Sequence, residues 1–304
     1  MNRRALLVLG AVLACAAGTL AAQPQGRFRA GVELVSLNVT VMDGTKYVTD
    51  LDQSEFEVFE DGAKQGITFF SRLQQPIALA VLLDTSNSME ERLPTAQEAA
   101  VGFARRITPA DVMTVVEFNS QVRTAQPFTN DKAALERAIR QTTVNGSTAL
   151  YNAIYVSLRE LKKERAHSSE EIRRQAIVLL SDGDDTSSLV EYEEVLDLAK
   201  RSETAIYAIG LRQAEPGRPK FKEAEFVLRQ LSQETGGRVF FPTSTAELPK
   251  IYDQISEELS SQYSIAYSSK NPLRNGAWRR IELRVTRPGV SARARRGYYG
   301  PIGK

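Results

Sequence analysis

Between residues 76 and 261, short apolar runs alternate with segments whose apolar residues recur at helical spacing. The runs at 77–83, 176–180 and 205–209 contain no charged residue, which is typical of strands covered on both faces. The clearest helical pattern spans 246–261, where apolar residues recur every three or four positions. Further helices are expected over 93–106, 131–140, 150–164 and 189–201, and further strands over 112–118 and 122–126. This order predicts an α/β fold, a doubly wound, mostly parallel sheet with helices on both faces.

Both flanks of this region show the period-two alternation of half-buried strands instead. In the first flank, residues 35–41 alternate, and Asp61-Gly62 supplies a hairpin signal. In the second, 263–267 and 281–285 alternate. Neither flank has enough strands to enclose its own core, so we expect them to pair into one split all-β sandwich. The predicted organisation is therefore a first sandwich part at 30–73, an inserted α/β domain at 76–261 and a second sandwich part at 262–300.

The first 22 residues have the pattern of an export signal. Asn2-Arg3-Arg4 is a short basic start, an apolar stretch follows, and small residues precede Gln23. We expect cleavage near Ala21 or Ala22 and a bacterial protein exported to the periplasm or beyond the cell. An alternative is a lipid anchor at Cys15, because Val12-Leu13-Ala14-Cys15 loosely resembles a lipoprotein signal. No later apolar stretch has spanning length, so no membrane span is expected in the mature chain.

Composition excludes several classes of function. The chain has 39 Lys and Arg against 37 Asp and Glu, which does not favour a nucleic-acid partner. Arg293, Arg295 and Arg296 alternate with small residues and are expected on the outer face of a strand. A single Cys and a single His exclude a zinc cluster and leave little room for a Ser-His-Asp hydrolase.

Polar residues follow the predicted buried strands at positions where an open α/β sheet binds its ligands. Asp84, Ser86 and Ser88 come directly after the strand at 77–83, and Asp182 comes just after the strand at 176–180. Thr148 lies in a polar loop before a helix. Carboxylates and hydroxyls are hard oxygen ligands, which suit Mg²⁺ or Mn²⁺ better than zinc or copper.

These residues carry a resemblance to a known family. Asp84-x-Ser86-x-Ser88, followed by Thr148 and Asp182, resembles the metal-ion-dependent adhesion site of von Willebrand factor type A (VWA) domains over about 76–261. The resemblance implies direct ligation by Ser86, Ser88 and Thr148, with Asp84 and Asp182 acting largely through water. The bound cation would be Mg²⁺, with Mn²⁺ or Ca²⁺ as alternatives. The flanks also resemble secreted bacterial VWA-related proteins, through the segment 56–62 and the closing Arg296-Gly297-Tyr298-Tyr299.

The resulting hypothesis is a secreted, non-enzymatic binding protein whose cation captures an Asp or Glu of a protein partner. One alternative is a Mg²⁺-dependent phosphotransferase or hydrolase with Asp84 as nucleophile. Enzymes that resemble haloacid dehalogenases carry a second Asp two residues on, where this chain has Ser86. Another alternative is an envelope protein in which the metal is purely structural.

Overall fold

The computed structural model describes residues 34–167, 173–182, 184–211 and 220–303. The expected export signal, Cys15 and residues 212–219 therefore lie outside the described residues. All described elements belong to one compact unit of the chain, Glu33–Lys304. Within the described residues, no helix is long and apolar enough to cross a membrane.

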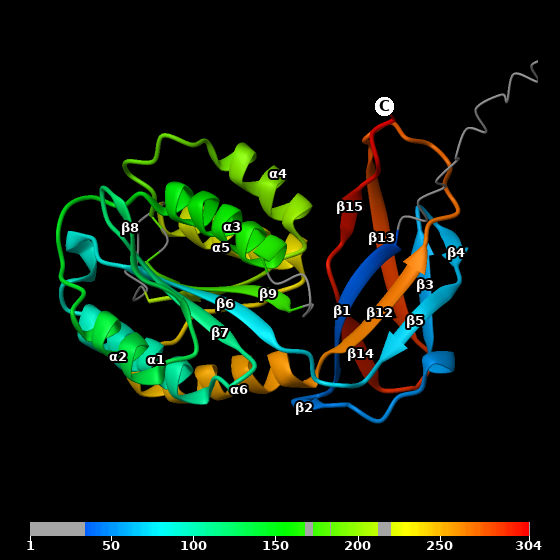
Figure 1. The fold of residues 1–304 in the computed structure, drawn as a ribbon, viewed down its shortest axis with the longest axis horizontal. Helices are drawn as coiled ribbons and strands as arrows, with labels where there is room; N and C mark the ends of the chain where they lie inside the picture. Colours follow the sequence, from blue (N-terminus) through cyan, green and yellow to red (C-terminus); the bar gives the residue numbers. More distant parts are fainter. Residues whose placement is uncertain (1–33, 168–172, 183, 212–219, 304) are drawn as a thin grey trace, which may run out of the picture. The chain divides into compact units, whose positions relative to one another are not determined.

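A six-stranded sheet forms the centre of the α/β part, in the order β11-β10-β9-β6-β7-β8 (Figure 1). Its strands are β6 (Ile77–Asp84), β7 (Val112–Phe118), β8 (Val122–Thr129), β9 (Arg174–Ser181), β10 (Ala205–Gly210) and β11 (Val239–Phe240). Only the β7–β8 pair is antiparallel. Every residue of β6, β9 and β10 is buried, because helices cover both faces of the sheet. The predicted doubly wound fold is confirmed.

Six α-helices form the two outer layers. They are α1 (Leu93–Arg106), α2 (Lys132–Arg140), α3 (Leu150–His167), α4 (Tyr192–Ser202), α5 (Lys220–Thr235) and α6 (Leu248–Ser261). Helices α1, α2 and α6 share one apolar core with the sheet, and α3, α4 and α5 share the core on the other face (Figure 1). Helix α5 was not expected from the sequence. A signal exists there, because Ala224, Val227, Leu228 and Leu231 are buried at helical spacing.

The flanking strands form two antiparallel sheets. One has the order β14-β1-β12-β5, with β2 paired to β1, and the other has the order β15-β13-β3-β4. The N-terminal strands are β1 (Leu34–Asp43), β2 (Lys46–Tyr47), β3 (Phe56–Glu60), β4 (Ala63–Gln65) and β5 (Ile67–Ser71). The C-terminal strands are β12 (Tyr263–Ser268), β13 (Trp278–Val285), β14 (Val290–Arg293) and β15 (Gly297–Tyr299). Three short 3-10 helices lie at Gln53–Glu55, Asn87–Met89 and Thr245–Glu247.

The two ends of the chain share one sandwich core. Leu37 of β1 lies opposite Ile265 of β12, and Val58 of β3 lies opposite Leu283 of β13. Buried side chains from both sheets form a single apolar cluster, as expected for a split sandwich. The predicted turn at Asp61-Gly62 joins β3 to β4, and both residues have positive φ, as a tight hairpin turn requires.

Buried polar side chains connect helix α6 to the sandwich. Glu258 of α6 is fully buried, and its Oε1 accepts hydrogen bonds from the Tyr207 hydroxyl at 2.7 Å and from the Arg293 guanidinium. Arg295 pairs with Glu203 at the end of α4. These arginines do lie outside the sandwich core, but they contact the α/β part rather than solvent alone.

Candidate metal centre

The candidate centre lies where the direction of winding of the α/β sheet reverses. Strands β6 and β9 are parallel neighbours, yet the helix after β6 covers one face of the sheet and the helix after β9 covers the other. Such a reversal opens a crevice at the carboxyl ends of the two strands, where α/β folds bind ligands. Asp84 is the last residue of β6, and Asp182 directly follows β9.

Asp84 is completely buried and held by three hydrogen bonds. Its Oδ1 accepts from the Ser86 amide at 3.0 Å and the Ser86 hydroxyl at 2.6 Å, and its Oδ2 accepts from the Ser181 hydroxyl at 2.6 Å. Burial raises the pKa of Asp84 to about 6, against the effect of these hydrogen bonds, and the negative charge of Asp182 adds to the rise. A cation at this position would favour the charged form of Asp84.

The hydroxyl groups of Ser86 and Ser88 lie side by side. Ser86 is the N-cap of the 3-10 helix Asn87–Met89, and this turn brings its Oγ to 3.0 Å from that of Ser88. Ser86 is buried, whereas Ser88 is exposed. The pair thus presents two neutral oxygen atoms at the boundary between the protein interior and solvent.

Backbone hydrogen bonds hold the loop before α3 against the loop after β6. The Asn145 amide donates to the Thr85 carbonyl at 2.8 Å, and the Asn87 amide donates to the Gly146 carbonyl at 3.0 Å. Gly146 has a φ of +71°, which an L-residue adopts at a cost, and an added Cβ would lie 2.8 Å from the Ser120 hydroxyl. Thr148 follows in the same loop and is buried. The structure therefore places Thr148 in a loop that is fixed to the Asp84–Ser88 segment.

The loop after β9 completes the arrangement. The Thr148 carbonyl accepts from the Thr186 amide at 2.8 Å, and the Thr148 amide donates to the Thr186 hydroxyl at 2.9 Å. Asp182 is 4% exposed, and its Oδ1 is buried with no hydrogen-bond partner among the described residues. A buried carboxylate oxygen without a partner is costly unless a cation or an ordered water meets it. This orphaned oxygen fits the predicted metal.

The donor set is made entirely of oxygen. Within the described ranges, no three His, Cys, Asp or Glu side chains gather into a metal-binding cluster. The five predicted residues instead offer two carboxylates and three hydroxyls, which is a set suited to Mg²⁺ or Mn²⁺ and not to a soft metal.

The supporting roles of two further residues were not predicted from the sequence. Ser181 supplies the hydroxyl that binds Asp84, and Asp185 holds the start of α3 by accepting from the Tyr151 amide at 3.1 Å. Asp185 also accepts from the Ser188 hydroxyl at 2.6 Å, so its carboxylate is already engaged. The sequence offers a weak signal for Ser181, since it ends a buried strand two positions before a glycine.

The part of the chain that builds this centre matches a known protein family. The model of the von Willebrand factor type A domain matches residues 78–254, more than half of the 304 residues. The chain belongs to the VWA family. Its members are generally interaction and adhesion modules rather than enzymes.

Individual VWA relatives are distant. A von Willebrand factor type A protein from Catenulispora acidiphila aligns in structure with a TM-score of 0.53 and 12% identity, covering 90% of this chain and 76% of that protein. An aerotolerance-related membrane protein from Bacteroides fragilis aligns with a TM-score of 0.48 and 17% identity, over 60% of this chain and 98% of that one. In sequence, an uncharacterised protein of Borreliella burgdorferi is 27% identical over 209 residues. That match spans 63% of this chain and 58% of the relative. The likeness to the Catenulispora acidiphila protein, with a TM-score above 0.5, supports the fold.

Proposed function

We propose that the protein binds an acidic group of a protein partner through a divalent cation, Mg²⁺ in the first place, held by Asp84, Ser86, Ser88, Thr148 and Asp182. The buried, unpartnered Oδ1 of Asp182 is the observation that carries this proposal. It lies in the loop that follows β9, next to the strand that ends in buried Asp84.

The charge of the donor set favours an incoming carboxylate. Three of the five donors are neutral hydroxyls, so a cation ligated directly by them keeps much of its positive charge. Ser88 is exposed, which leaves the cation accessible from solvent. An Asp or Glu of a partner would fill the open coordination position and supply the missing negative charge.

The geometry disfavours the enzymatic alternative. Both oxygen atoms of Asp84 already accept hydrogen bonds, and the residue has no exposed surface. A nucleophilic carboxylate must reach the substrate at bonding distance. The alternative of a purely structural metal is tested together with partner capture below.

Export forms part of the proposal. The basic start, apolar stretch and small residues within 1–22 support a cleaved signal, with lipidation of Cys15 as the alternative. The working location is the bacterial periplasm or the extracellular space. Removal of Arg3 and Arg4 leaves equal numbers of basic and acidic residues, so attraction for an acidic partner would have to come from the local cation.

Metal binding is tested by titrating Mg²⁺, Mn²⁺ and Ca²⁺ into the purified protein in a calorimeter. The isosteric variant Asp182→Asn and the surface variant Ser88→Ala should each lose at least about tenfold in Mg²⁺ affinity. The control Glu194→Gln changes an exposed carboxyl group of α4 outside the centre, and it should stay close to wild type. Wild-type affinity in Asp182→Asn would refute the proposed ligand set.

Partner capture is tested with immobilised protein and a cell-envelope extract, in Mg²⁺ and in EDTA. A captured protein should be released by EDTA and should not bind Asp182→Asn. If EDTA lowers the melting temperature but leaves the captured proteins unchanged, the metal is structural and the adhesion proposal is wrong.

A further inference from the structure

A cavity lies at the amino ends of strands β9 and β10, at the end of the α/β sheet opposite to the candidate metal centre. It measures about 270 Å³ and is bounded by the starts of β9 and β10 and by strands β1, β12 and β5 of the sandwich. This volume is just below the roughly 300–1,000 Å³ of pockets that hold drug-sized ligands, so it suits a smaller molecule. The cavity is independent of the metal proposal.

The charged lining of this cavity is mainly cationic. Four arginines and a single glutamate line it, namely Arg165, Arg173, Arg174, Arg295 and Glu203. Glu203 is shared by two of the arginines: it accepts from Arg165 at 2.9 Å and from Arg295 at 3.1 Å. One carboxylate therefore serves two guanidinium groups.

Arg174 is a buried cation without a carboxylate partner. It is 4% exposed, and its guanidinium donates to the carbonyls of Leu259 and Gln262 and to the Ser264 hydroxyl, at 2.9–3.1 Å. No acidic side chain among the described residues forms an ion pair with it, and burial lowers the pKa of Arg174 to about 10.

The carboxyl end of helix α6 compensates part of the positive charge of Arg174. Leu259 lies in the last turn of α6, so the guanidinium caps the negative end of that helix, which corresponds to about half an elementary charge. No carboxylate among the described residues is paired with the rest of this charge. In addition, the Nε–H groups of Arg174 and Arg295 are both buried without an acceptor among the described residues. Unpaired buried donors and charges of this kind are stabilised when an anion lies beside them.

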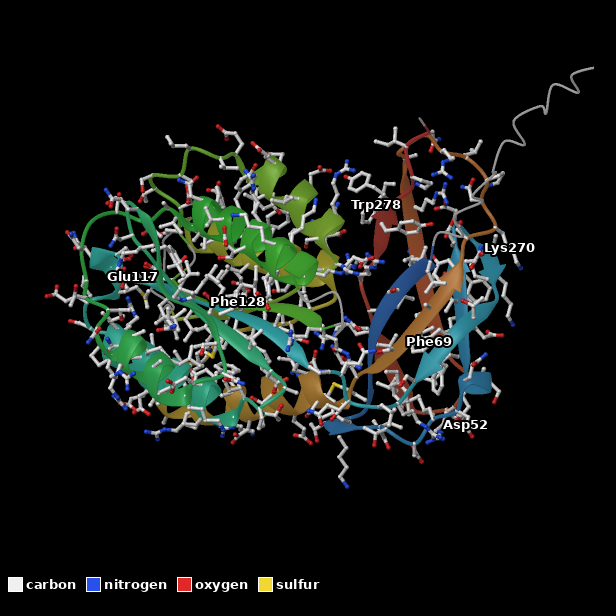
Figure 2. The ribbon with its side chains drawn as sticks, viewed as in Figure 1. Asp52, Phe69, Glu117, Phe128, Lys270 and Trp278 are labelled. Carbon is white, nitrogen blue, oxygen red and sulfur yellow. The ribbon has the colours of Figure 1, made fainter. Side chains whose placement is uncertain are left out.

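The other wall of the cavity includes exposed apolar side chains. Phe69 of β5 lies opposite Ala266 of β12, which in turn lies opposite Ser36 of β1, so the three form a row across the sheet. Phe69 is 47% exposed and Leu34 is 50% exposed, although both are large apolar residues. Figure 2 labels Phe69 on the sandwich. Exposed apolar residues that line a cavity indicate a ligand with an apolar part.

We propose that this cavity binds a small organic anion, whose carboxylate lies beside Arg174 and Arg295 and whose apolar body packs against Leu34 and Phe69. The carboxylate of the ligand compensates Arg174, which has no ion pair among the described residues, and Arg295, which shares Glu203 with Arg165. The apolar body of the ligand covers the exposed side chains of Leu34 and Phe69.

The test is calorimetric titration of hexanoate into the full-length protein in EDTA, so that no carboxylate can bind through a metal. Two matched probes separate the contributions. Hexanol has the apolar chain without the charge, and sulfate has the charge without an apolar chain. We expect saturable binding of hexanoate and much weaker binding of both probes. Equal binding of hexanol would overturn the anion site. Sulfate binding as tight as hexanoate would overturn the role of the apolar wall.

Arg174 is left unchanged in the variants because it caps helix α6, and its loss could prevent folding. The variants below change other residues of the cavity. Phe69→Ser should weaken hexanoate about fivefold, and Arg295→Gln about tenfold. Glu203→Gln removes the competing carboxylate and should tighten binding, which a merely structural role of these residues would not produce. Arg280→Gln removes one exposed positive charge outside the cavity and should leave binding unchanged. Absence of saturable hexanoate binding, or wild-type affinity in Phe69→Ser and Arg295→Gln, would refute the proposal.

Discussion

The burial of Asp84 depends on hydrogen bonds from side chains on the neighbouring strand and the following turn. Asp84 would be an unfavourable residue at the end of a buried strand if nothing donated to it. The neighbouring strand supplies Ser181, and the following turn supplies Ser86. The carboxylate is thereby kept in a fixed orientation in a fully buried position.

Replacement of Ser181 by alanine tests this dependence. Ser181→Ala leaves Oδ2 of Asp84 without its hydrogen bond, and we expect the free energy of unfolding in EDTA to fall by about 1–3 kcal/mol. Urea denaturation measures the change. Ser54→Ala, at an exposed position in the sandwich, is the control and should have no measurable effect. An unchanged stability in Ser181→Ala would show that this hydroxyl does not support Asp84.

Among the elements, helix α6 contacts both the α/β part and the sandwich. One side of the helix packs in the core of the α/β part, and its fully buried Glu258 contacts groups from β10, β1 and β14. Its last carbonyls are capped by Arg174 of β9. The helix thus receives polar contacts from both the α/β part and the sandwich.

The two adjacent glutamates of α6 offer a matched comparison. Glu258→Gln breaks the ion pair between fully buried Glu258 and part-buried Arg293, and we expect a loss of about 2–4 kcal/mol in the free energy of unfolding. Glu257→Gln changes the exposed neighbour and should alter stability by less than about 0.5 kcal/mol. Urea titrations of both variants at neutral pH decide the point, and equal effects would mean that the Glu258 network contributes nothing specific.

At the scale of the whole molecule, two different folds share one chain and a set of polar contacts. Glu258–Arg293 and Glu203–Arg295 join α-helices to the end of the sandwich sequence. The aromatic pair Trp278–Tyr299 also meets α4, where Lys200 lies 4.7 Å from the Trp278 ring centre and Arg201 lies 3.7 Å from that of Tyr299. These contacts predict that the two parts unfold together.

The single tryptophan makes this prediction measurable. Trp278 reports on the sandwich (Figure 2), whereas the helical circular dichroism signal comes from α1–α6 of the α/β part. We expect urea unfolding curves from fluorescence and from circular dichroism at 222 nm to coincide, as in a two-state transition. Two separate midpoints would show that the parts unfold independently.

The layers of the fold could be predicted because buried apolar residues recur at the characteristic spacing of a helix or a strand within each element. The apolar runs predicted β6, β9 and β10, and alternation predicted β1 and β12, since each pattern depends on residues within one segment. Helix α5 was missed although its buried residues recur at helical spacing. The expectation for Arg293, Arg295 and Arg296 was incomplete, because periodicity identifies a face of a strand but not what covers it.

The residue types of the candidate centre were also visible in the sequence, and their role as ligands stays a prediction. By itself, the sequence determined the layers, the split sandwich and the oxygen chemistry at the strand ends. Tertiary structure alone decided that Ser181 donates a hydrogen bond to Asp84, that Oδ1 of Asp182 meets no partner among the described residues and that a cavity lined by arginines forms at the opposite end of the sheet. The reason is physical. Periodicity is a local property, whereas contacts such as Thr40–Glu258, 218 residues apart, exist only when distant segments are brought together.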